Sequence, residues 1–167
     1  MSALTSPVRP GFRRSPLDVA QLTELTRALV RDEQLWLPRV RFGTRDRRWW
    51  TRLHGSETLD VWLLTWLPGH TTDLHDHGAS SAAYAVARGA LEEVRVADGR
   101  TTSTVLPAGS AAWVAAGVAH DVRGVGAEPA VSIHAYSPPL VEMTYYALDG
   151  GRLQRTRVVP SREPEGS

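Results

Sequence analysis

The chain has 167 residues, of which 42% are hydrophobic and 22% are charged. This length suits one compact domain built around a single core. Its 19 basic residues, all arginine, stand against 18 acidic ones, so the net charge is only +1 and no strong basic field favours nucleic acid or an anionic membrane surface. The chain has neither lysine nor cysteine, which excludes Schiff-base lysines, disulfides, Cys-ligated metals and cysteine nucleophiles.

The composition also bears on location and partners. A cysteine-free chain fits a reducing cytosol, and no run of about 18 apolar residues predicts a membrane span. We therefore expect a cytoplasmic protein with no nucleic-acid partner and no membrane partner. We also expect a monomer, although composition does not indicate the oligomeric state.

Proline, glycine and arginine are frequent in residues 1–15, which we expect to form a flexible arm. The next residues look like the start of a helix, with Ser15 as N-cap, Pro16 at the first helical position and Asp18 at the third. Apolar residues then recur at helical spacing up to about Asp32, which predicts one amphipathic helix. A single domain is expected over residues 16–160 and a frayed tail over 161–167.

From about residue 47 the apolar pattern changes to period two. Short runs rich in Val, Thr, Trp, Tyr and Leu are separated by proline and glycine, and no second helical segment follows. Strand-like runs at this regular spacing predict an all-β fold, an antiparallel sandwich or barrel. The predicted strands cover residues 48–53, 59–67, 81–88, 91–97, 101–106, 111–114, 121–124, 130–136, 143–148 and 153–159.

The six histidines carry most of the chemical information. His75 and His77 stand at i and i+2, and on an extended strand such side chains leave from the same face. His120 follows a Gly-Val-Ala turn into another predicted strand. Since imidazole is a common ligand for zinc, copper, iron and nickel, we predict a metal site at His75, His77 and His120, with His54 and His70 outside it.

A second polar pattern lies on the predicted strand 130–136. Ser132, His134 and Tyr136 stand at i, i+2 and i+4, so they share one face, while Ile133 and Ala135 share the other. A hydroxyl, an imidazole and a phenol in a row can form a hydrogen-bonded relay that orients the phenol and tunes its acidity. The alternative is a polar face turned to solvent.

The spacing of these residues resembles the cupin family. Its first motif is matched by Gly69-x5-His75-x-His77-x4-Ala82-x6-Gly89, except that cupins carry Glu at the position of Ala82. The core of its second motif is similar to Gly117-Val118-Ala119-His120. The chain thus looks like a cupin with three histidines and without the carboxylate ligand.

Within the cupins, this departure resembles the thiol dioxygenases. Residues 129–139, Pro-Ala-Val-Ser-Ile-His-Ala-Tyr-Ser-Pro-Pro, closely resemble a strand of cysteine dioxygenase, and Trp50-Thr51-Arg52 followed by Leu64-Thr65-Trp66 resembles its substrate-binding segment. The resemblance implies a small β-barrel or jelly-roll cupin with an N-terminal helix, and a cis peptide bond between Ser137 and Pro138.

The same resemblance implies roles for the site residues. His75, His77 and His120 would hold Fe(II), which would bind L-cysteine through its thiolate and amine and react it with O2 to give cysteine sulfinic acid. Arg52 would bind the substrate carboxylate, and Tyr136, oriented by His134 and Ser132, would hydrogen-bond to the reacting oxygen and to the carboxylate. The substrate pocket would also include Trp50, Leu64, Trp66 and Ala82.

Three neutral imidazoles suit this chemistry, because they leave the charge of Fe(II) uncompensated and so favour an anionic thiolate. Alanine at position 82 makes room for the substrate where a carboxylate would block a coordination position. The chain departs from the animal enzymes of this family, which carry at that position a cysteine crosslinked to the tyrosine corresponding to Tyr136. A chain without cysteine cannot form this crosslink.

Three other functions stay open at this point. One is a dioxygenase for 3-mercaptopropionate or another small thiol, although members with that preference tend to carry Gln at the position of Arg52. A second is a cupin that binds a ligand through a metal without turning it over. A third is a zinc isomerase or hydrolase, for which Asp76 and Glu92 are the nearest candidate bases.

Overall fold

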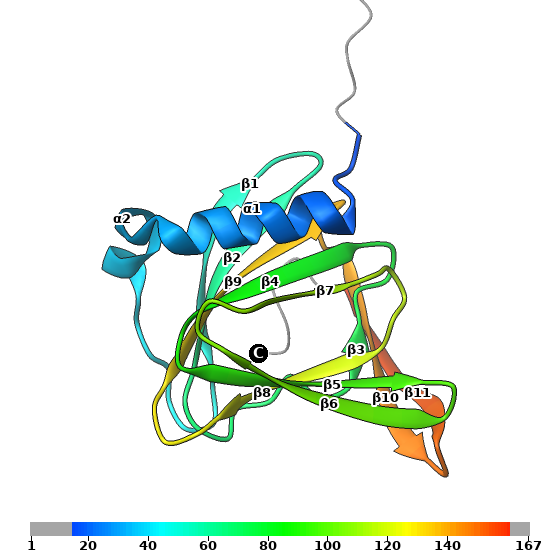
Figure 1. The fold of residues 1–167 in the computed structure, drawn as a ribbon. Coiled ribbons are helices and arrows are strands. Elements are labelled where there is room, and N and C mark those ends of the chain that lie inside the picture. The colour runs from blue at the N-terminus through cyan, green and yellow to red at the C-terminus, as the bar shows by residue number, and fades with distance from the viewer. Residues whose placement is uncertain (1–14, 161–167) are drawn as a thin grey trace, which may run out of the picture.

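A computed structural model describes residues 15–160 of the chain. Within them, the N-terminal part is helical and the remainder is almost entirely strand and turn (Figure 1). The helical elements are α1 (Val19–Arg31), α2 (Glu33–Trp36) and the 3-10 turn η1 (Leu37–Arg39). The strands are β1 (Trp49–Gly55), β2 (Asp60–Trp66), β3 (His75–Asp76), β4 (Ser81–Arg88), β5 (Ala90–Ala97), β6 (Arg100–Pro107), β7 (Ala111–Val114), β8 (His120–Val125), β9 (Ala130–Ser137), β10 (Glu142–Asp149) and β11 (Arg152–Pro160).

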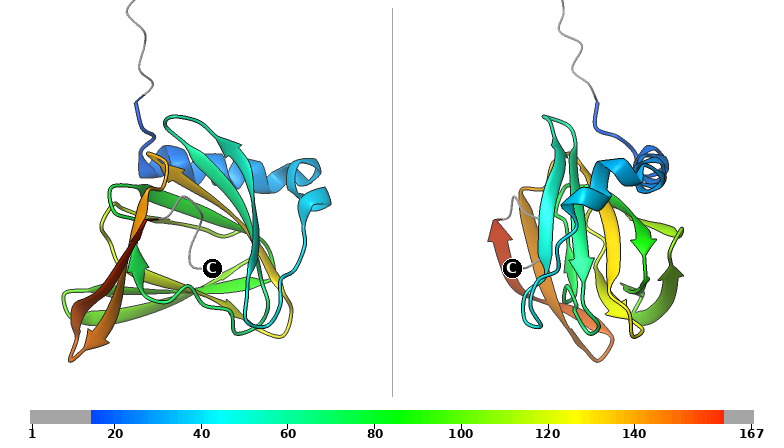
Figure 2. Two further views of the ribbon diagram at one scale, coloured as in Figure 1. Left: turned by 180° about the vertical axis from the view of Figure 1, so that it is seen from behind. Right: turned by 90° about the vertical axis from the view of Figure 1, so that its left-hand side faces the viewer.

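The strands form two antiparallel sheets that face each other as the walls of a barrel (Figure 1). One sheet has the order β1-β2-β9-β4-β7, and the other has the order β11-β10-β3-β8-β5-β6. The helix α1 lies across the outer face of the five-stranded sheet, whereas the β10–β11 hairpin lies on the side of the barrel away from α1 (Figure 2). This is the all-β cupin architecture with an N-terminal helix, as predicted.

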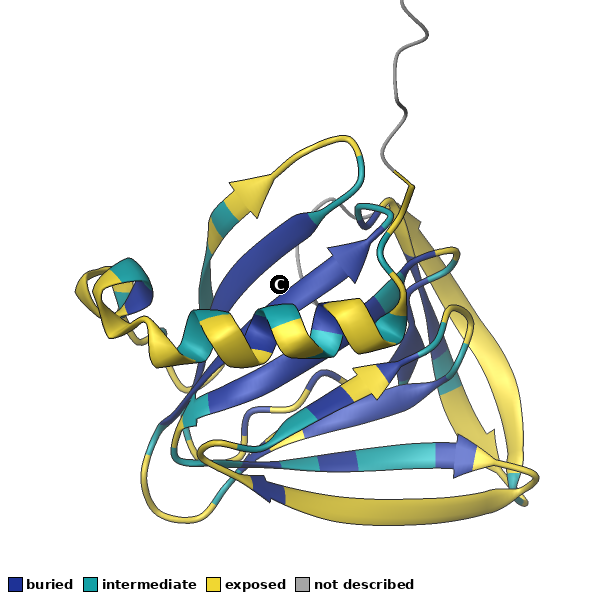
Figure 3. Cartoon of the chain, turned by 45° about the horizontal axis from the view of Figure 1, so that its top comes forward, coloured by how far each residue is buried: buried dark blue, intermediate teal, exposed yellow. Residues whose placement is uncertain are grey.

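Period-two alternation divides the buried residues of the five-stranded sheet between two cores. Along β2, Trp62, Leu64 and Trp66 enter the core between the sheets, while Val61 and Leu63 pack beneath α1 with Leu22 of that helix. Because β2 and β9 are covered on both faces, every residue in them is buried (Figure 3). The outer strands β6 and β11 are mostly exposed. The interior of the barrel is therefore formed by one face of each sheet.

The helical region differs in two details from the prediction. The helix begins at Val19 rather than at Pro16, because Asp18 is the N-cap and forms a reciprocal capping box with Gln21. The short helix α2 follows, although a second helical segment was not expected.

All ten predicted strands are present, and one further strand was not predicted. β3 has only two residues, and Asp73 just before it has a positive φ of 59°, so no period-two run marks it in the sequence. The Ser137–Pro138 bond is cis, as the family resemblance implied. The predicted arm falls outside the described residues except for Ser15, and the predicted tail falls outside them entirely. Among the described helices, none has both the length and the apolar character needed to cross a membrane.

Candidate metal centre

Two neighbouring strands of the six-stranded sheet, β3 and β8, bring three histidines together. His75 is on β3, His77 directly follows that strand, and His120 begins β8 as the register partner of His75. Each ring is at most 2% exposed, and the ring centroids are 4.8–5.0 Å apart. One nitrogen from each ring lies within 4.8 Å of the others, so the predicted histidines do converge.

Hydrogen bonds orient two of these rings. Nδ1 of His75 lies 2.8 Å from the Asp73 carbonyl oxygen, which can only accept, so this nitrogen carries the proton and Nε2 has the free electron pair. Nδ1 of His120 lies 3.0 Å from Oε1 of Glu93, which leaves Nε2 of His120 as its metal-binding atom by the same logic.

The geometry fits a metal ion. Nε2 of His75 lies 3.1 Å from Nε2 of His77. Two nitrogens bound to one ion at about 2.1 Å, at angles between octahedral and tetrahedral, are separated by roughly 3.0–3.4 Å. The donor set consists of three imidazoles, with no carboxylate oxygen among the clustered ligand atoms of the described residues. Such a set suits iron, zinc, copper or nickel.

Glu93 is a site residue that the sequence reading missed. Its side chain is 5% exposed, and its second oxygen, Oε2, lies 3.0 Å from Nε of Arg95. Burial by itself raises the pKa of the Glu93 carboxyl, but the hydrogen bonds and charges of His120 and Arg95 outweigh it and hold the pKa below its ordinary value. A carboxylate therefore supports the back of His120. Its signal was the alternation on β5, which places Glu93 on the same inward face as the buried Leu91.

The carboxylates of Asp76 and Glu92, which were expected near the site, do not contact the three histidines. Asp76 alternates with His75 and His77, so it faces away from them and accepts hydrogen bonds from Tyr146 Oη at 2.5 Å and the Gly78 amide at 2.9 Å. Burial and the adjacent Asp76 carboxylate raise the pKa of the Tyr146 hydroxyl. Glu92 is hydrogen-bonded to Ser103 on the opposite face of β5 from Glu93. The expectation that these were the nearest carboxylates was wrong.

The polar row on β9 faces the interior, so the alternative of a row turned to solvent does not hold. Ser132, His134 and Tyr136 are each at most 1% exposed. Oγ of Ser132 lies 2.8 Å from Nε2 of His134 and accepts a hydrogen bond of 2.9 Å from Nε1 of Trp66. The ring of Tyr136 stands edge-on to His77, with centroids 5.0 Å apart. The row thus joins the histidine cluster at its tyrosine end.

The flanking strands β4 and β2, and β1 beyond β2, supply the other predicted pocket residues. On β4, Ala82 pairs in register with Tyr136, and Tyr84 stacks on His134 at 4.8 Å. Leu64 of β2 pairs with Ser132. Trp50 of β1 pairs with Leu64 and packs against the same core. Tyr84 belongs to this wall although the sequence reading did not single it out.

Arg52 lies on β1, which β2 separates from the row, and it is already engaged by an acidic residue. It pairs in register with Trp62 on the interior face of β1, and its Nη2 donates to Oδ1 of Asp60. Asp60 is 2% exposed and is the register partner of Tyr136 on β9. Asp60 was not expected in the site, since its pairing with Arg52 and Tyr136 depends on two sheet contacts.

The other two predicted placements concern His54 and His70. His54 is exposed near the end of β1. His70 is buried, but its Nδ1 accepts from the Leu67 amide and its Nε2 contacts the carbonyl oxygens of Thr44 and Arg45. Both histidines lie outside the metal-ligand cluster.

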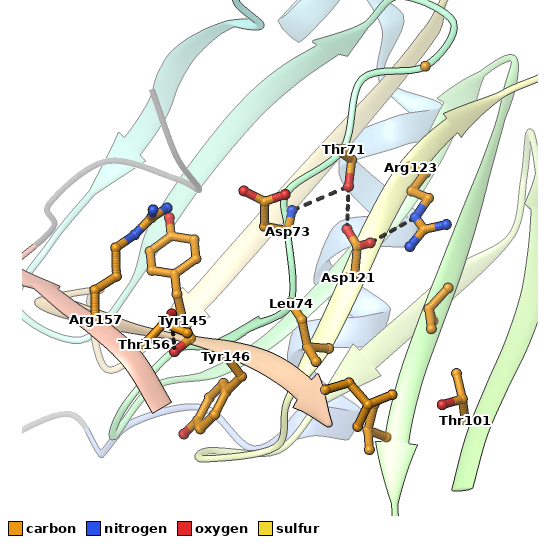
Figure 4. A pocket seen from close by; sticks show the side chains of 14 residues that line it. Thr71, Asp73, Leu74, Thr101, Asp121, Arg123, Tyr145, Tyr146, Thr156 and Arg157 are labelled. Carbon is orange, nitrogen blue, oxygen red and sulfur yellow. Dashed lines mark hydrogen bonds and ion pairs between the residues drawn. The ribbon is translucent and has the colours of Figure 1, made fainter. Parts of the chain in front are cut away.

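A separate cavity of about 660 Å³ lies against the opposite face of the six-stranded sheet (Figure 4). Asp121 and Arg123 line it and alternate along β8 with His120 and Val122, so they point away from the histidines. Asp121 accepts hydrogen bonds from Thr71 at 2.7 Å and from Arg123 at 2.8 Å. Thr71, Asp121 and Arg123 thus bond to one another on the face of β8 away from the metal centre.

Comparisons with known proteins agree with this geometry. The family model described as "Cysteine dioxygenase type I" matches residues 2–148. A curated protein from Danio rerio, "Cysteine dioxygenase type 1", is 28% identical over 142 residues, which are 77% of this chain and 69% of the relative.

Solved structures show the same fold. A protein from Thermus thermophilus is 28% identical with a TM-score of 0.53, over 61% of this chain and 93% of its own. A Klebsiella pneumoniae protein with a double-stranded beta-helix domain is 21% identical with a TM-score of 0.52, over 59% of this chain and 83% of its own, and supports the fold alone. From the family match, together with the fold and the three-histidine cluster, the chain belongs to the cysteine dioxygenase type I family and is a thiol dioxygenase of the cupin superfamily.

Proposed function

We propose that this thiol dioxygenase oxidises L-cysteine with O2 to cysteine sulfinic acid, at an Fe(II) ion held by His75, His77 and His120. The observation that carries the substrate assignment is the guanidinium of Arg52, which is on the interior face of β1 and half-exposed. Its strand is separated by β2 from β9, the strand that carries Tyr136. A cationic side chain at this place suits a thiol that also bears a carboxylate.

The ligand set supports a thiolate-binding ion. The Nε2 atoms of His75 and His120 carry electron pairs because their Nδ1 atoms donate to Asp73 and Glu93. Fe(II) bound here would lower the pKa of a substrate thiol and allow electrons to pass from the thiolate sulfur to O2. Ala82, which is 3% exposed, adds no carboxylate that would neutralise the ion or occupy its coordination positions.

The β9 row would control the proton at the reacting end of the substrate. We assign Tyr136 as the group that donates a hydrogen bond from Oη to the substrate during oxidation, because its ring borders His77 and is fully buried. His134, fixed between the Ser132 hydroxyl and the ring of Tyr84, would hold the tyrosine in place. Burial among these rings excludes bulk water from the hydroxyl.

The remaining wall would bind the rest of the substrate. Arg52 would pair with the carboxylate through donors that Asp60 does not occupy. Trp50, Leu64, Trp66 and Ala82 would shape the apolar side of the pocket. A pocket of this kind suits a small amino acid, and we further propose that the enzyme acts as a cytoplasmic monomer.

The test is turnover by Fe(II)-loaded protein with three thiols under the same conditions. L-cysteine, 3-mercaptopropionate and cysteamine share the thiol, but 3-mercaptopropionate lacks the amine and cysteamine lacks the carboxylate. We expect the highest kcat/KM for cysteine, with one O2 consumed for each sulfinate formed. Zinc-loaded protein, in which the ion cannot supply electrons, is the control.

Other outcomes would assign another function. A higher kcat/KM for 3-mercaptopropionate than for cysteine would contradict the substrate proposal while keeping the reaction. No O2 uptake with any of the thiols, from protein with a full complement of iron, would favour a cupin that binds ligands without turnover.

A further inference from the structure

The guanidinium of Arg52 packs against Gly55, a residue without a side chain. A β-bulge between Arg52 and His54 changes the register of β1, and Gly55 then pairs with Asp60 of β2. A methyl group on Gly55 would lie 2.5 Å from Nη2 and 2.6 Å from Nε of Arg52. The guanidinium therefore occupies the space that a Cβ at position 55 would fill.

Asp60 holds the same guanidinium from the interior side. The Asp60 side chain is 3% exposed, whereas that of Arg52 is 49% exposed. Among the described residues, Arg52 is the one side chain that hydrogen-bonds to this carboxylate. Removing a partner from a buried charge is strongly unfavourable, so Arg52 cannot swing into solvent without leaving Asp60 unpaired in the interior.

The third contact is aromatic. Cζ of Arg52 lies 5.5 Å from the ring centroid of Trp62, within range of a cation–π interaction. Trp62 and Asp60 pair in register with His134 and Tyr136 respectively. The guanidinium is thus fixed relative to the β9 row, and the hydrogen bond to Asp60 uses Nη2, which leaves the donors on Nε and Nη1 for a ligand.

We propose that Asp60 and Gly55 are positioning residues for Arg52, which make the guanidinium a fixed anchor that selects thiols by where their carboxylate lies. This inference rests on the proposed function of Arg52 as the carboxylate-binding residue. A fixed anchor favours the substrate whose carboxylate reaches it when the thiol is at the metal centre, because no side-chain freedom is lost on binding. A mobile arginine would accept carboxylates at several distances and discriminate less.

The opposite role for Asp60 predicts the opposite result. If the carboxylate merely competed with the substrate for Arg52, its neutralisation would strengthen cysteine binding. If it positions Arg52, its neutralisation weakens cysteine binding although the site becomes more positive. The sign of the effect therefore separates positioning from competition.

Two variants change the contacts that hold the Arg52 guanidinium in different ways. Asp60→Asn keeps the shape and weakens the charge-assisted bond, whereas Gly55→Ala keeps the charge and displaces the guanidinium. The backbone of Gly55 is outside the positive-φ region, and the atoms that its new methyl would meet are the flexible end of Arg52, so Gly55→Ala should fold normally. Each variant is compared with wild type for cysteine and for cysteamine, which has no carboxylate.

We expect both variants to lower the ratio of kcat/KM for cysteine to kcat/KM for cysteamine by roughly 10-fold, mainly through a higher KM for cysteine. Weakening a hydrogen bond to a charged group changes an equilibrium constant by about this factor. The dissociation constant of cysteine, measured without O2 on the Fe(II)-loaded protein, should rise by a similar factor. In the Arg52→Ala background, which is the matched control, neither substitution should change the ratio further. A purely structural defect would instead lower turnover of both thiols equally.

The outcomes keep this inference separate from the proposed function. The positioning role is overturned if either variant keeps the wild-type ratio of kcat/KM for cysteine to kcat/KM for cysteamine. It is also overturned if Asp60→Asn binds cysteine more tightly than wild type. Both conclusions hold even if Arg52→Ala itself is impaired. The inference is supported if Arg52→Ala loses the preference for cysteine, and if Asp60→Asn and Gly55→Ala then no longer change the ratio when they are added to Arg52→Ala. A wild-type enzyme that oxidises no thiol overturns the proposed function and this inference with it.

Discussion

The carboxylate of Glu93 lies 3.0 Å from Nδ1 of His120, on the side of the ring away from the other two histidines. The Glu93 side chain is itself held by Arg95 at 3.0 Å. A carboxylate behind a metal-binding imidazole fixes its tautomer and raises its basicity as a ligand. The neighbouring strand β5 therefore supplies an anionic support to the three-histidine centre.

Replacing this support should weaken metal binding. We expect Glu93→Gln to raise the dissociation constant for Fe(II) by about 10- to 100-fold, because the amide holds the ring less firmly and does not raise its basicity. Competition with a chromophoric chelator measures this constant without any turnover. Glu92→Gln is the matched control, since it removes a carboxylate one residue away on the opposite face of β5, and it should bind metal as wild type does. Equal affinity in the two variants would contradict the role of Glu93.

The contrast between Glu93 and the histidines shows what sequence can predict here. His75 and His77 are two residues apart, and their shared face follows from strand geometry alone. The period-two runs predicted every long strand for the same reason, since each is a local pattern. Glu93 lies 27 residues from His120, and only the pairing of β5 with β8 brings the two together. Without that pairing, the alternation along β5 marks Glu93 only as an inward-facing residue and does not connect it with His120.

The same distinction explains the other differences. Asp60 becomes a site residue through its pairing with β1 on one side and β9 on the other, and neither contact is local. The start of α1 was placed too early because Ser15 and Asp18 are both good N-caps, and the choice depends on the reciprocal bonds with Gln21. The motif resemblance located Arg52 and Tyr136, but it could not indicate that Asp60 would lie between them.

Arg52 itself should control substrate choice. If it pairs with the carboxylate in a partly enclosed pocket, Arg52→Ala should lower kcat/KM for cysteine by about 30- to 1000-fold. The effect on cysteamine should be much smaller, and Arg52→Gln should narrow the difference between cysteine and 3-mercaptopropionate. Steady-state O2 uptake with the three thiols provides the measurement. Unchanged cysteine kinetics in Arg52→Ala would mean that another residue binds the carboxylate.

The packing of α1 on the five-stranded sheet makes a prediction about stability. Leu22 of α1 is completely buried between the helix and the sheet, so Leu22→Ala should lower the free energy of unfolding by about 2–5 kcal/mol. Leu148→Ala is the same substitution at a leucine that is 45% exposed on β10, and it should cost less than about 1 kcal/mol. Urea denaturation of the two variants and wild type gives the comparison. Similar losses in both would show that the helix is not packed as described.

The last prediction concerns Ala82 and Tyr136, which face each other across β4 and β9 as register partners. Side chains directly opposite each other in an antiparallel pair have Cβ atoms about 4.5–5.5 Å apart, so a thiol at position 82 would lie beside the phenol ring. Ala82 is 3% exposed and packs with Tyr136 in the same core, which places the pair next to His77. The enzyme therefore has the geometry for a thioether crosslink and lacks only the sulfur.

We expect Ala82→Cys to form this crosslink during turnover with Fe(II), cysteine and O2. A bond forms between Sγ and a ring carbon of Tyr136, the S–H and C–H bonds break, and O2 takes up the two hydrogens and two electrons as hydrogen peroxide. Mass spectrometry would then detect the loss of two hydrogen atoms and a peptide pair joined through positions 82 and 136. Ala82→Cys combined with Tyr136→Phe is the matched control and should remain uncrosslinked, because phenylalanine lacks the phenol that activates the ring. An unmodified Ala82→Cys protein after many turnovers would show that the two side chains do not meet at the metal centre.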